Sequence, residues 1–454
     1  MSKSEIKDFT EGNITKQLLL FAAPLFLSNL LQVVYNMVDM AVVGATVGKE
    51  GISAVSVGGD IIALLTFVGM GFGGAGQVLI AKYVGLGQRE KIGRFVGTMS
   101  GFLAVAVAVL TLVGIVFREP LLLLMNTPSE AYSGALSYSV ICTLGLIFIY
   151  GYNIVSAVLR GMGDSKHPFV FIAIAAAINV VLDIVFVVWL GMGAAGAALA
   201  TVISQAGSFV ISVIYLILHR ERFSLDVSFS CFIHWDREML ADLVRLGTPM
   251  AIKTASIQFS KLFVNSFINS YGIAVSAFAG IANKIASVAN LISMAMNNAG
   301  STMVGQNIAA RKYSRVNKIL LNLALITLTV SAVLSAVMLL APDAVYSLFA
   351  TDPDVLKIGR EFVPISLILF LAAALRAVMN ALMNGSGNYK INFATAIFDG
   401  IVMRIGLALL FGIALGMEHL GFWLGDALAG FTSFVIGTVF YLSGKWRAKN
   451  YAAD

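Results

Sequence analysis

The sequence predicts an all-α membrane protein, with twelve transmembrane helices in two six-helix lobes that are related by a parallel pseudo-two-fold repeat. Three observations support this prediction. Of the 454 residues, 59% are hydrophobic and only 12% are charged, whereas about a quarter of the residues of a soluble domain are charged. Long apolar runs recur along the whole chain, and the second half repeats motifs of the first.

Each apolar run is long enough to be a membrane helix, since ~30 Å of hydrocarbon requires about 20 residues. Segments such as IFIYGYNIVSAVL, residues 147–159, lack the period-two alternation of a membrane barrel strand, so we expect helices. The expected spans are residues 15–42, 51–81, 94–117, 133–159, 167–190, 193–218, 240–270, 273–305, 317–341, 358–384, 391–415 and 420–443.

Basic residues predict the orientation of these spans. The tails and the connections after even-numbered spans hold 21 of the 30 lysines and arginines, against four on the opposite side. By the positive-inside rule we expect a protein of the cell membrane with both termini in the cytoplasm. Residues 1–14 carry charges of both signs and no small-residue cleavage site, so we interpret them as a cytoplasmic tail rather than a signal peptide.

An internal repeat divides the chain into two halves. LRGMGDSKHP at residue 159 recurs as LMNGSGNYKI at 382, which gives an offset near 224, and APLFLSNL recurs as TPMAIKTA. Six spans per half place both halves in the same orientation, an arrangement that transporters use to form a substrate path. The expected domains are an N-terminal tail (1–14), an N-lobe (15–218), a cytoplasmic linker (219–238), a C-lobe (239–444) and a C-terminal tail (445–454).

Several classes of function are disfavoured. The two cysteines and four scattered histidines lack the spacing of a disulfide framework or a zinc site. The net charge of +6 follows the membrane topology, so we expect no nucleic-acid partner. GMGFGGAG, residues 69–76, lies inside an apolar run, where small residues favour close helix packing over dinucleotide binding.

Polar residues recur inside the spans of the first half. Asn179 and Asp183 lie four residues apart and therefore share a helix face, as do Tyr35 and Asp39. The fourth and sixth spans add two more oxygen-bearing side chains. The complete set is Tyr35, Asp39, Asn153, Asn179, Asp183 and Thr201.

We interpret this set as a site for a proton or a sodium ion. A charge in a membrane span normally lies in the protein interior or in an aqueous cavity. Two carboxylates that converge there disfavour double ionisation, and oxygen atoms suit a small hard cation. The alternative is a set of unrelated interhelical hydrogen bonds. The repeat favours the ion site, since the second half has Phe263, Ala377, Met403, Leu407 and Gly425 at the positions of Asp39, Asn153, Asn179, Asp183 and Thr201.

The spans of the second half carry basic residues instead. Asp399 and Asp426 lie in the same half and could neutralise some of them, and residues near helix ends could extend to the interface. We expect Lys261 or Arg376 to contact the substrate cavity and to influence which substrate charge is accepted. The complete basic set is Lys253, Lys261, Lys284, Arg376 and Arg404.

The order and spacing of these features resemble the multidrug and toxic compound extrusion (MATE) transporters. The segments that carry the resemblance are ITKQLLLFAAPLFLSNLLQVVYNMVDMAVVG, then LRGMGDSKHPFVFIAIAAAINVVLDIVF and GMGAAGAALATVISQ. The resemblance extends over about residues 10 to 445. It implies secondary active efflux of amphipathic, often cationic, compounds that is driven by a proton or sodium gradient.

The resemblance also implies roles for particular residues. The family's N-lobe cation site matches Asp39, Asn153, Asn179, Asp183 and Thr201, and Pro24 matches a proline at which the first helix bends. The sodium-coupled branch has acidic residues on the seventh and tenth helices, where this chain has Ile257, Gln258 and Arg376. The basic residues also disfavour a strictly cationic substrate, because like charges repel.

From the sequence we expect a monomeric antiporter, not an enzyme, that exports drugs or toxins by alternating access in exchange for H⁺ or Na⁺, without another cofactor. The choice between the two ions and the identity of the substrate stay open. A flippase for an anionic lipid-linked or conjugated substrate, with Lys261, Lys284, Arg376 and Arg404 as binding groups, is one alternative. A membrane scaffold without transport is the other.

Overall fold

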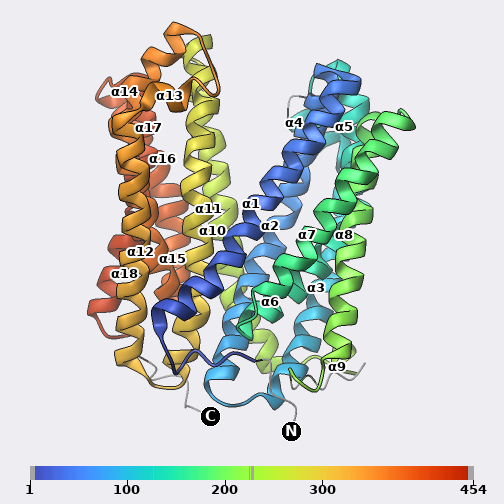
Figure 1. Ribbon diagram of the computed structural model, residues 1–454, viewed down its shortest axis with the longest axis vertical. Helices are drawn as coiled ribbons and strands as arrows, with labels where there is room; N and C mark the ends of the chain where they lie inside the picture. Colours follow the sequence, from blue (N-terminus) through green and yellow to red (C-terminus); the bar gives the residue numbers. More distant parts are fainter. Residues whose placement is uncertain (1–5, 126, 224, 226–229, 448–454) are drawn as a thin grey trace. The chain divides into compact units, whose positions relative to one another are not determined.

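The computed structural model describes residues 6–125, 127–223, 225 and 230–447 and is drawn in Figure 1. Throughout these ranges the chain forms helices and turns, without a strand. The described residues therefore have the all-helical fold that the composition and the long apolar runs predict. Parts of the expected tails and of the expected linker, residues 1–5, 226–229 and 448–454 among them, lie outside the described residues.

In chain order the helices are α1 (Ile14–Val47), α2 (Lys49–Gly85), α3 (Glu90–Val116), α4 (Arg118–Leu124), α5 (Ser129–Leu144), α6 (Leu146–Gly161), α7 (Lys166–Asp183), the π-helix η1 (Ile184–Trp189), α8 (Gly193–Leu218), α9 (Ser230–Ile233), α10 (Arg237–Asn269), α11 (Ile273–Ala309), α12 (Tyr313–Leu340), α13 (Pro342–Tyr346), α14 (Pro353–Gly385), α15 (Tyr389–Ile397), the π-helix η2 (Phe398–Val402), α16 (Met403–Leu409), the π-helix η3 (Leu410–Ala414), α17 (Glu418–Ala429) and α18 (Thr432–Leu442).

Among the described residues, ten helical segments are long and apolar enough to cross a membrane. An eleventh span is formed by α5 and α6, which meet at a 50° bend next to Gly145. The remaining expected span is α10, which has 33 residues but is less apolar, since it contains Lys253 and Lys261. Twelve helical passages therefore account for the twelve expected spans.

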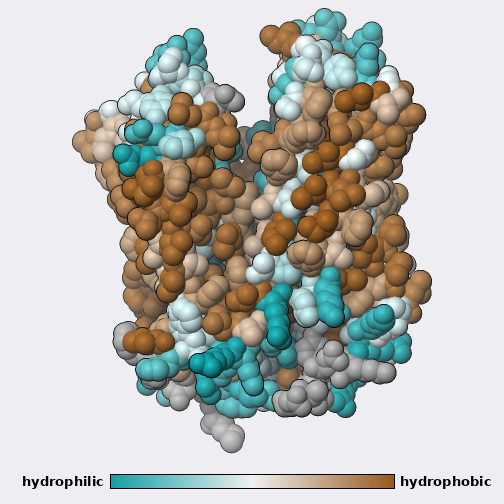
Figure 2. Space-filling view, turned by 180° about the vertical axis from the view of Figure 1, so that it is seen from behind, coloured by the Kyte–Doolittle hydropathy of each residue, from teal (hydrophilic) through white to brown (hydrophobic). Residues whose placement is uncertain are grey.

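The surface matches a bilayer environment. Figure 2 shows hydrophobic residues over the middle of each half of the chain and hydrophilic residues gathered towards the ends. Large apolar side chains within the helices are exposed, for example Val105 of α3, Val210 of α8 and Leu325 of α12. In water such an area would be unfavourable, whereas acyl chains are a suitable solvent for it.

The chain forms two compact units. Among the described residues, unit 1 contains 6–7 and 27–247, and unit 2 contains 8–26 and 248–447. The borders differ from the expected lobes because they fall inside helices: α1 passes from unit 2 to unit 1 after Phe26, and α10 passes from unit 1 to unit 2 after Gly247. Hydropathy could not locate these borders, since both helices continue through them.

The segment before α1 is packed rather than a free tail. Phe9 is 2% exposed, its N–H donates to Gln306 Oε1 at 2.8 Å, and its carbonyl accepts from Arg315 Nε at 3.0 Å. Phe9 also belongs to an apolar cluster with Leu18 and Phe21 of α1. The polar composition of this segment predicted a tail, and the structure packs residues 8–13 of it in unit 2.

The described part of the expected linker is packed as well. The Asp236 carboxylate forms an ion pair with Arg94 Nε at 3.1 Å, and the Asp236 backbone N–H donates to Thr98 Oγ1 at 3.2 Å. Both partners lie on α3, and Trp235 packs edge-on against Phe102 of the same helix. This part of residues 219–238 therefore belongs to unit 1.

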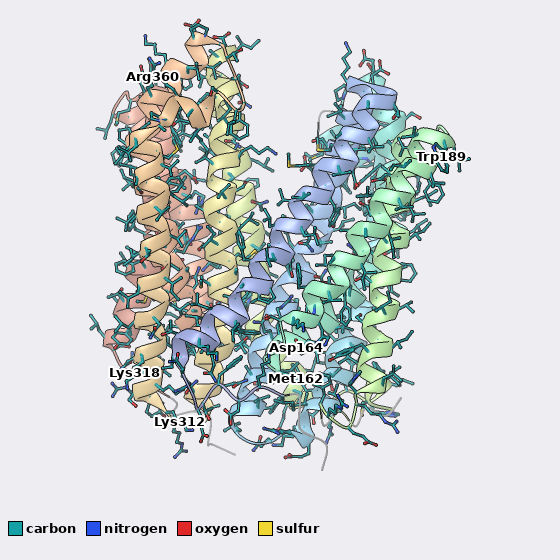
Figure 3. The ribbon with its side chains drawn as sticks, in the orientation of Figure 1. Met162, Asp164, Trp189, Lys312, Lys318 and Arg360 are labelled. Atoms are coloured by element: carbon teal, nitrogen blue, oxygen red, sulfur yellow. The ribbon has the colours of Figure 1, made fainter. Side chains whose placement is uncertain are left out.

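Basic residues from the two predicted sides of the membrane lie at opposite ends of unit 2 where Figure 3 labels them. Figure 3 shows Lys312 and Lys318 near one end of this unit and Arg360 near the other. The sequence predicts Lys312 and Lys318 on the cytoplasmic side and Arg360 on the opposite side. The positions of these three residues are consistent with that separation.

The internal repeat is visible in helix packing. Helices α2 and α11 have the same length of 37 residues and begin 224 residues apart, at Lys49 and Ile273. The last residue of α6, Gly161, approaches the Gln77 carbonyl so closely that an added Cβ would lie 2.8 Å from its oxygen. Gly385, the last residue of α14, approaches the Ser301 carbonyl in the same way, at 2.7 Å. Each half therefore uses a glycine for the same close contact.

The glycine-rich segment of α2 packs against neighbouring helices, as predicted. An added Cβ on Gly69 would lie 2.7 Å from the Tyr150 ring, and one on Gly76 would lie 2.2 Å from Met99 Sδ. The Gly69 N–H also donates to the Tyr150 hydroxyl at 3.1 Å. The G-x-G-x-x-G pattern thus serves helix packing in this chain.

Gly385→Ala is expected to destabilise the protein, because the new methyl group would press on the Ser301 carbonyl and on Val304. Overpacking of this kind costs about 1–3 kcal/mol. The measurement is the melting temperature of the purified protein in detergent. Gly280→Ala in α11 is the matched control, since nothing lies within 4 Å of its added Cβ. Equal melting temperatures for the two variants would contradict the close contact of Gly385 with the Ser301 carbonyl.

Candidate functional site

Two carboxyl groups meet inside unit 1. Asp39 of α1 and Asp183 of α7 lie close enough to interact electrostatically. Asp39 is 2% exposed and Asp183 is fully buried, as is Asn179 at 1%. The structure therefore brings together the acids of the first and fifth spans.

Local structure positions these groups. Asn179 and Asp183 lie one turn apart on α7, and both interact with the Asp39 side chain. Asp183 is the last α-helical residue before η1, where the chain continues with π-helical geometry. Such π-helical turns are rare overall, and those that occur are often found at functional sites.

Helix α8 supplies the third side of the cluster. Thr201 Oγ1 donates to Asp39 Oδ2 at 3.3 Å. One turn further along α8, Gln205 Nε2 donates to the Tyr35 hydroxyl at 3.5 Å, and Tyr35 in turn lies one turn before Asp39 on α1. Both residues of α1 and the threonine of α8 thus take the places that the sequence predicts.

Several buried polar atoms of the cluster have no hydrogen-bond partner in the described part of the protein. They are Asp39 Oδ1 and both carboxyl oxygens of Asp183, together with the amide oxygen and nitrogen of Asn179. Buried polar groups are nearly always paired, so such atoms require an explanation. A proton shared by the two carboxyl groups, or a sodium ion held by their oxygens, would satisfy the oxygen atoms of this set.

The sequence interpretation missed three members of this neighbourhood. Tyr138 and Cys142 of α5 are buried and interact with the Asp39 region, and Tyr138 also reaches Thr201. Gln205 is 7% exposed. The four-residue spacings of Tyr138 with Cys142 and of Thr201 with Gln205 are the same signal that identified Asn179 and Asp183.

Asn153 is not joined to the carboxyl groups by any described contact. Its Nδ2 donates to the Ile149 carbonyl of its own helix at 2.9 Å, and the side chain is half-buried. A cavity of about 1250 Å³ in unit 1 also lies apart from the carboxyl pair. Residues of α3, α6 and α8 line this cavity, among them Leu103, Val158 and Phe209.

Most of the basic set of the second half forms a cluster in unit 2. Arg404 is 2% exposed and binds Asp399 with Nη2 at 3.3 Å and Asp426 with Nη1. Asp399 also accepts from Ser433 Oγ at 2.7 Å. Lys284 differs, since it is exposed on α11 and has no described contact with this cluster.

The other three basic residues of the set are half-buried. Lys253 Nζ donates to Asn380 Oδ1 at 2.8 Å, and Arg376 Nη2 donates to Asn290 Oδ1 at 2.6 Å. Lys261 interacts electrostatically with Asp426 and with the neighbouring arginines. The helices that carry the cluster are α10, α11, α14, α16, α17 and α18, together with η2.

Known proteins resemble the chain along nearly its whole length. A family model described as MatE matches it twice, over residues 24–185 and 249–410, which are the two halves of the repeat. The "Probable multidrug resistance protein YpnP" of Bacillus subtilis (strain 168) is 29% identical over 446 residues, or 97% of this chain and 98% of that protein. The "Probable multidrug resistance protein YoeA" of the same organism is 28% identical over 94% of this chain and 93% of its own length.

Solved structures share the fold. One, named "Crystal structure of MATE in the straight conformation", superposes with a TM-score of 0.88 at 22% identity and covers 98% of both chains. At this identity the likeness shows the arrangement of the helices alone and says nothing about the residues of the site.

Proposed function

Since this chain belongs to the MATE family of membrane transporters, we propose that it exports amphipathic organic compounds in exchange for H⁺ or Na⁺. The family exports multidrug substrates and is not a family of enzymes. The proposal therefore concerns the coupling ion, the residues that bind it and the chemical class of the substrate.

The observation that supports this proposal best is the carboxyl pair of Asp39 and Asp183. Two buried carboxyl groups with unpaired oxygens can hold one small cation between them, and they lose stability when both are ionised without it. Gain or loss of the cation changes the packing of α1 against α7 and α8. If the cation and the substrate each lower the affinity for the other, exchange is obligatory, because such coupling is reciprocal.

The rest of the proposed mechanism is alternating access, with the chain as a monomer in the cell membrane and both termini in the cytoplasm. Two features support this topology: the repeat has six spans per half, and Lys312 and Lys318 lie at the end of unit 2 opposite to Arg360. The basic cluster of unit 2 favours a second candidate, export of an anionic lipid-linked or conjugated compound.

Gradient-driven transport in proteoliposomes tests the proposal. Purified protein is reconstituted with a fluorescent dye, and dye movement is followed under an imposed pH gradient, under an imposed sodium gradient and without a gradient. We expect one of the two gradients to accelerate transport, and its dissipation by an ionophore to abolish the acceleration. Dye movement that ignores both gradients would contradict coupled exchange.

A further inference from the structure

The basic cluster of unit 2 contains more positive than negative side chains. Its four basic residues are Lys253, Lys261, Arg376 and Arg404, and its two acidic residues are Asp399 and Asp426. Both acidic residues are bound by Arg404, which is buried between them. The whole cluster, with four basic and two acidic side chains, therefore keeps two excess positive charges.

The other three basic residues have neutral hydrogen-bond partners in the described part of the chain. Lys253 Nζ donates to Asn380 at 2.8 Å and to Ser433 at 3.4 Å, and Arg376 donates to Asn290 at 2.6 Å. For Lys261 the described contacts include no hydrogen bond or ion pair, only longer-range electrostatic interaction with Asp426 and the arginines. Amide and hydroxyl oxygens orient a cation, but they do not neutralise it.

These three side chains also retain donors for a ligand. An ammonium group has three N–H donors and a guanidinium group has five. Lys253 uses two of its donors and Arg376 uses one in the described contacts. All three side chains are half-buried, whereas Arg404 is 2% exposed, so part of each of the three remains accessible.

An excess of positive charge within a membrane protein is unfavourable unless a counter-charge is present. Carboxylate and phosphate groups complement guanidinium and ammonium donors well, since charge-assisted hydrogen bonds are the strongest of their kind and arginine can bind both oxygens at once. A cationic compound would meet repulsion at the same place.

We propose that Lys253, Lys261 and Arg376 bind the oxyanion group of a small amphipathic acid, and that Arg404 with Asp399 and Asp426 holds this site in position. The inference rests on the proposed function, because it assigns the substrate class of the same transporter. It places the acid-binding site in unit 2, on side chains separate from the carboxyl pair of unit 1.

Equilibrium binding of two dyes tests this assignment without any need for transport. The probes are fluorescein, which carries a carboxylate, and rhodamine 6G, a cation on a similar ring system. Binding to the purified full-length protein in detergent is followed by fluorescence anisotropy. The wild type is expected to bind fluorescein more tightly than rhodamine 6G, and added salt should weaken fluorescein binding because it screens the charges.

Single substitutions then identify the groups. Lys261→Gln and Arg376→Gln should each weaken fluorescein binding about tenfold or more, since each removes a charge-assisted hydrogen bond. Rhodamine 6G binding should stay equal or become tighter. Lys284→Gln is the matched control, because it removes the same charge from an exposed site outside the cluster, and it should bind fluorescein as the wild type does.

Two further variants separate charge from folding. Lys261→Arg and Arg376→Lys keep the positive charge and should retain the preference for fluorescein. Size-exclusion profiles and melting temperatures identify any variant that fails to fold. If Arg376→Gln is unfolded, Lys261→Gln provides the test, since its side chain has no hydrogen bond or ion pair among the described contacts.

The outcomes distinguish this inference from the proposed function. Wild-type fluorescein affinity in both Gln variants, or a wild-type preference for rhodamine 6G, would overturn the acid-binding site. Gradient-driven dye efflux could persist in that case, and the proposed function would then stand. Conversely, fluorescein binding that depends on Lys261 and Arg376 would support the site even if neither gradient drives transport.

Discussion

Asp183→Asn is expected to reduce gradient-driven efflux to the rate of protein-free liposomes while the protein remains folded. The asparagine keeps the size of the side chain but can neither release a proton nor carry a negative charge. The Asp183 carboxyl is fully buried and has no hydrogen-bond partner for either oxygen in the described structure. Its replacement by a neutral amide should therefore leave the melting temperature unchanged or raise it.

Asp39→Asn should give the same loss of coupled transport, because the two carboxyl groups act on one ion. The double variant should be no worse than either single variant, since residues that act as a unit are not additive. Asp60→Asn is the matched control, as Asp60 is an exposed carboxylate on α2 of the same unit. Wild-type efflux rates from either Asp39→Asn or Asp183→Asn would disprove the ion site.

Arg404→Gln is expected to cause the largest loss of stability. The guanidinium is 2% exposed, and its removal leaves Asp399 fully buried with Ser433 as the hydrogen-bond donor that remains among the described contacts. Breaking a buried ion pair in this way costs about 3–5 kcal/mol. We expect a low yield of folded protein and a clear drop in its melting temperature in detergent.

Removing the stranded acids should restore part of that stability. In the triple variant Arg404→Gln, Asp399→Asn and Asp426→Asn, no buried carboxylate is left without its arginine, so its melting temperature should exceed that of Arg404→Gln alone. Lys284→Gln on the exposed face of α11 should melt as the wild type does. A wild-type melting temperature for Arg404→Gln would show that the buried ion pairs contribute little.

The sequence predicted those parts of the fold that depend on burial in the lipid bilayer or in the protein interior. Nearly every span follows from apolar length, and the repeat follows from motifs such as the one that ends at Gly161 and Gly385. The meeting of Asp39 and Asp183 was also predictable, because an acid in an apolar helix has few favourable places other than the interior. These inferences need periodicity and burial alone.

Other features depend on tertiary contacts that periodicity does not encode. The place of Phe9 in unit 2 depends on Gln306 and Arg315, which lie nearly 300 residues away in the chain. Tyr138 of α5 shares a helix face with Cys142, but it joins the carboxyl site through the packing of several helices, which the spacing alone does not determine.

Helix α1 belongs to two bodies at once, with the anchor around Phe9 and Phe21 in one and Asp39 in the other. Pro24 lies between them and has no N–H, so the Leu20 carbonyl one turn earlier loses its usual helical donor. Bending is therefore easiest at this point of the helix. A displacement of α1 near Asp39 should therefore bend the helix mainly in the turn before Pro24. Helix α1 would in this way link the carboxyl site of one unit to the anchored segment of the other.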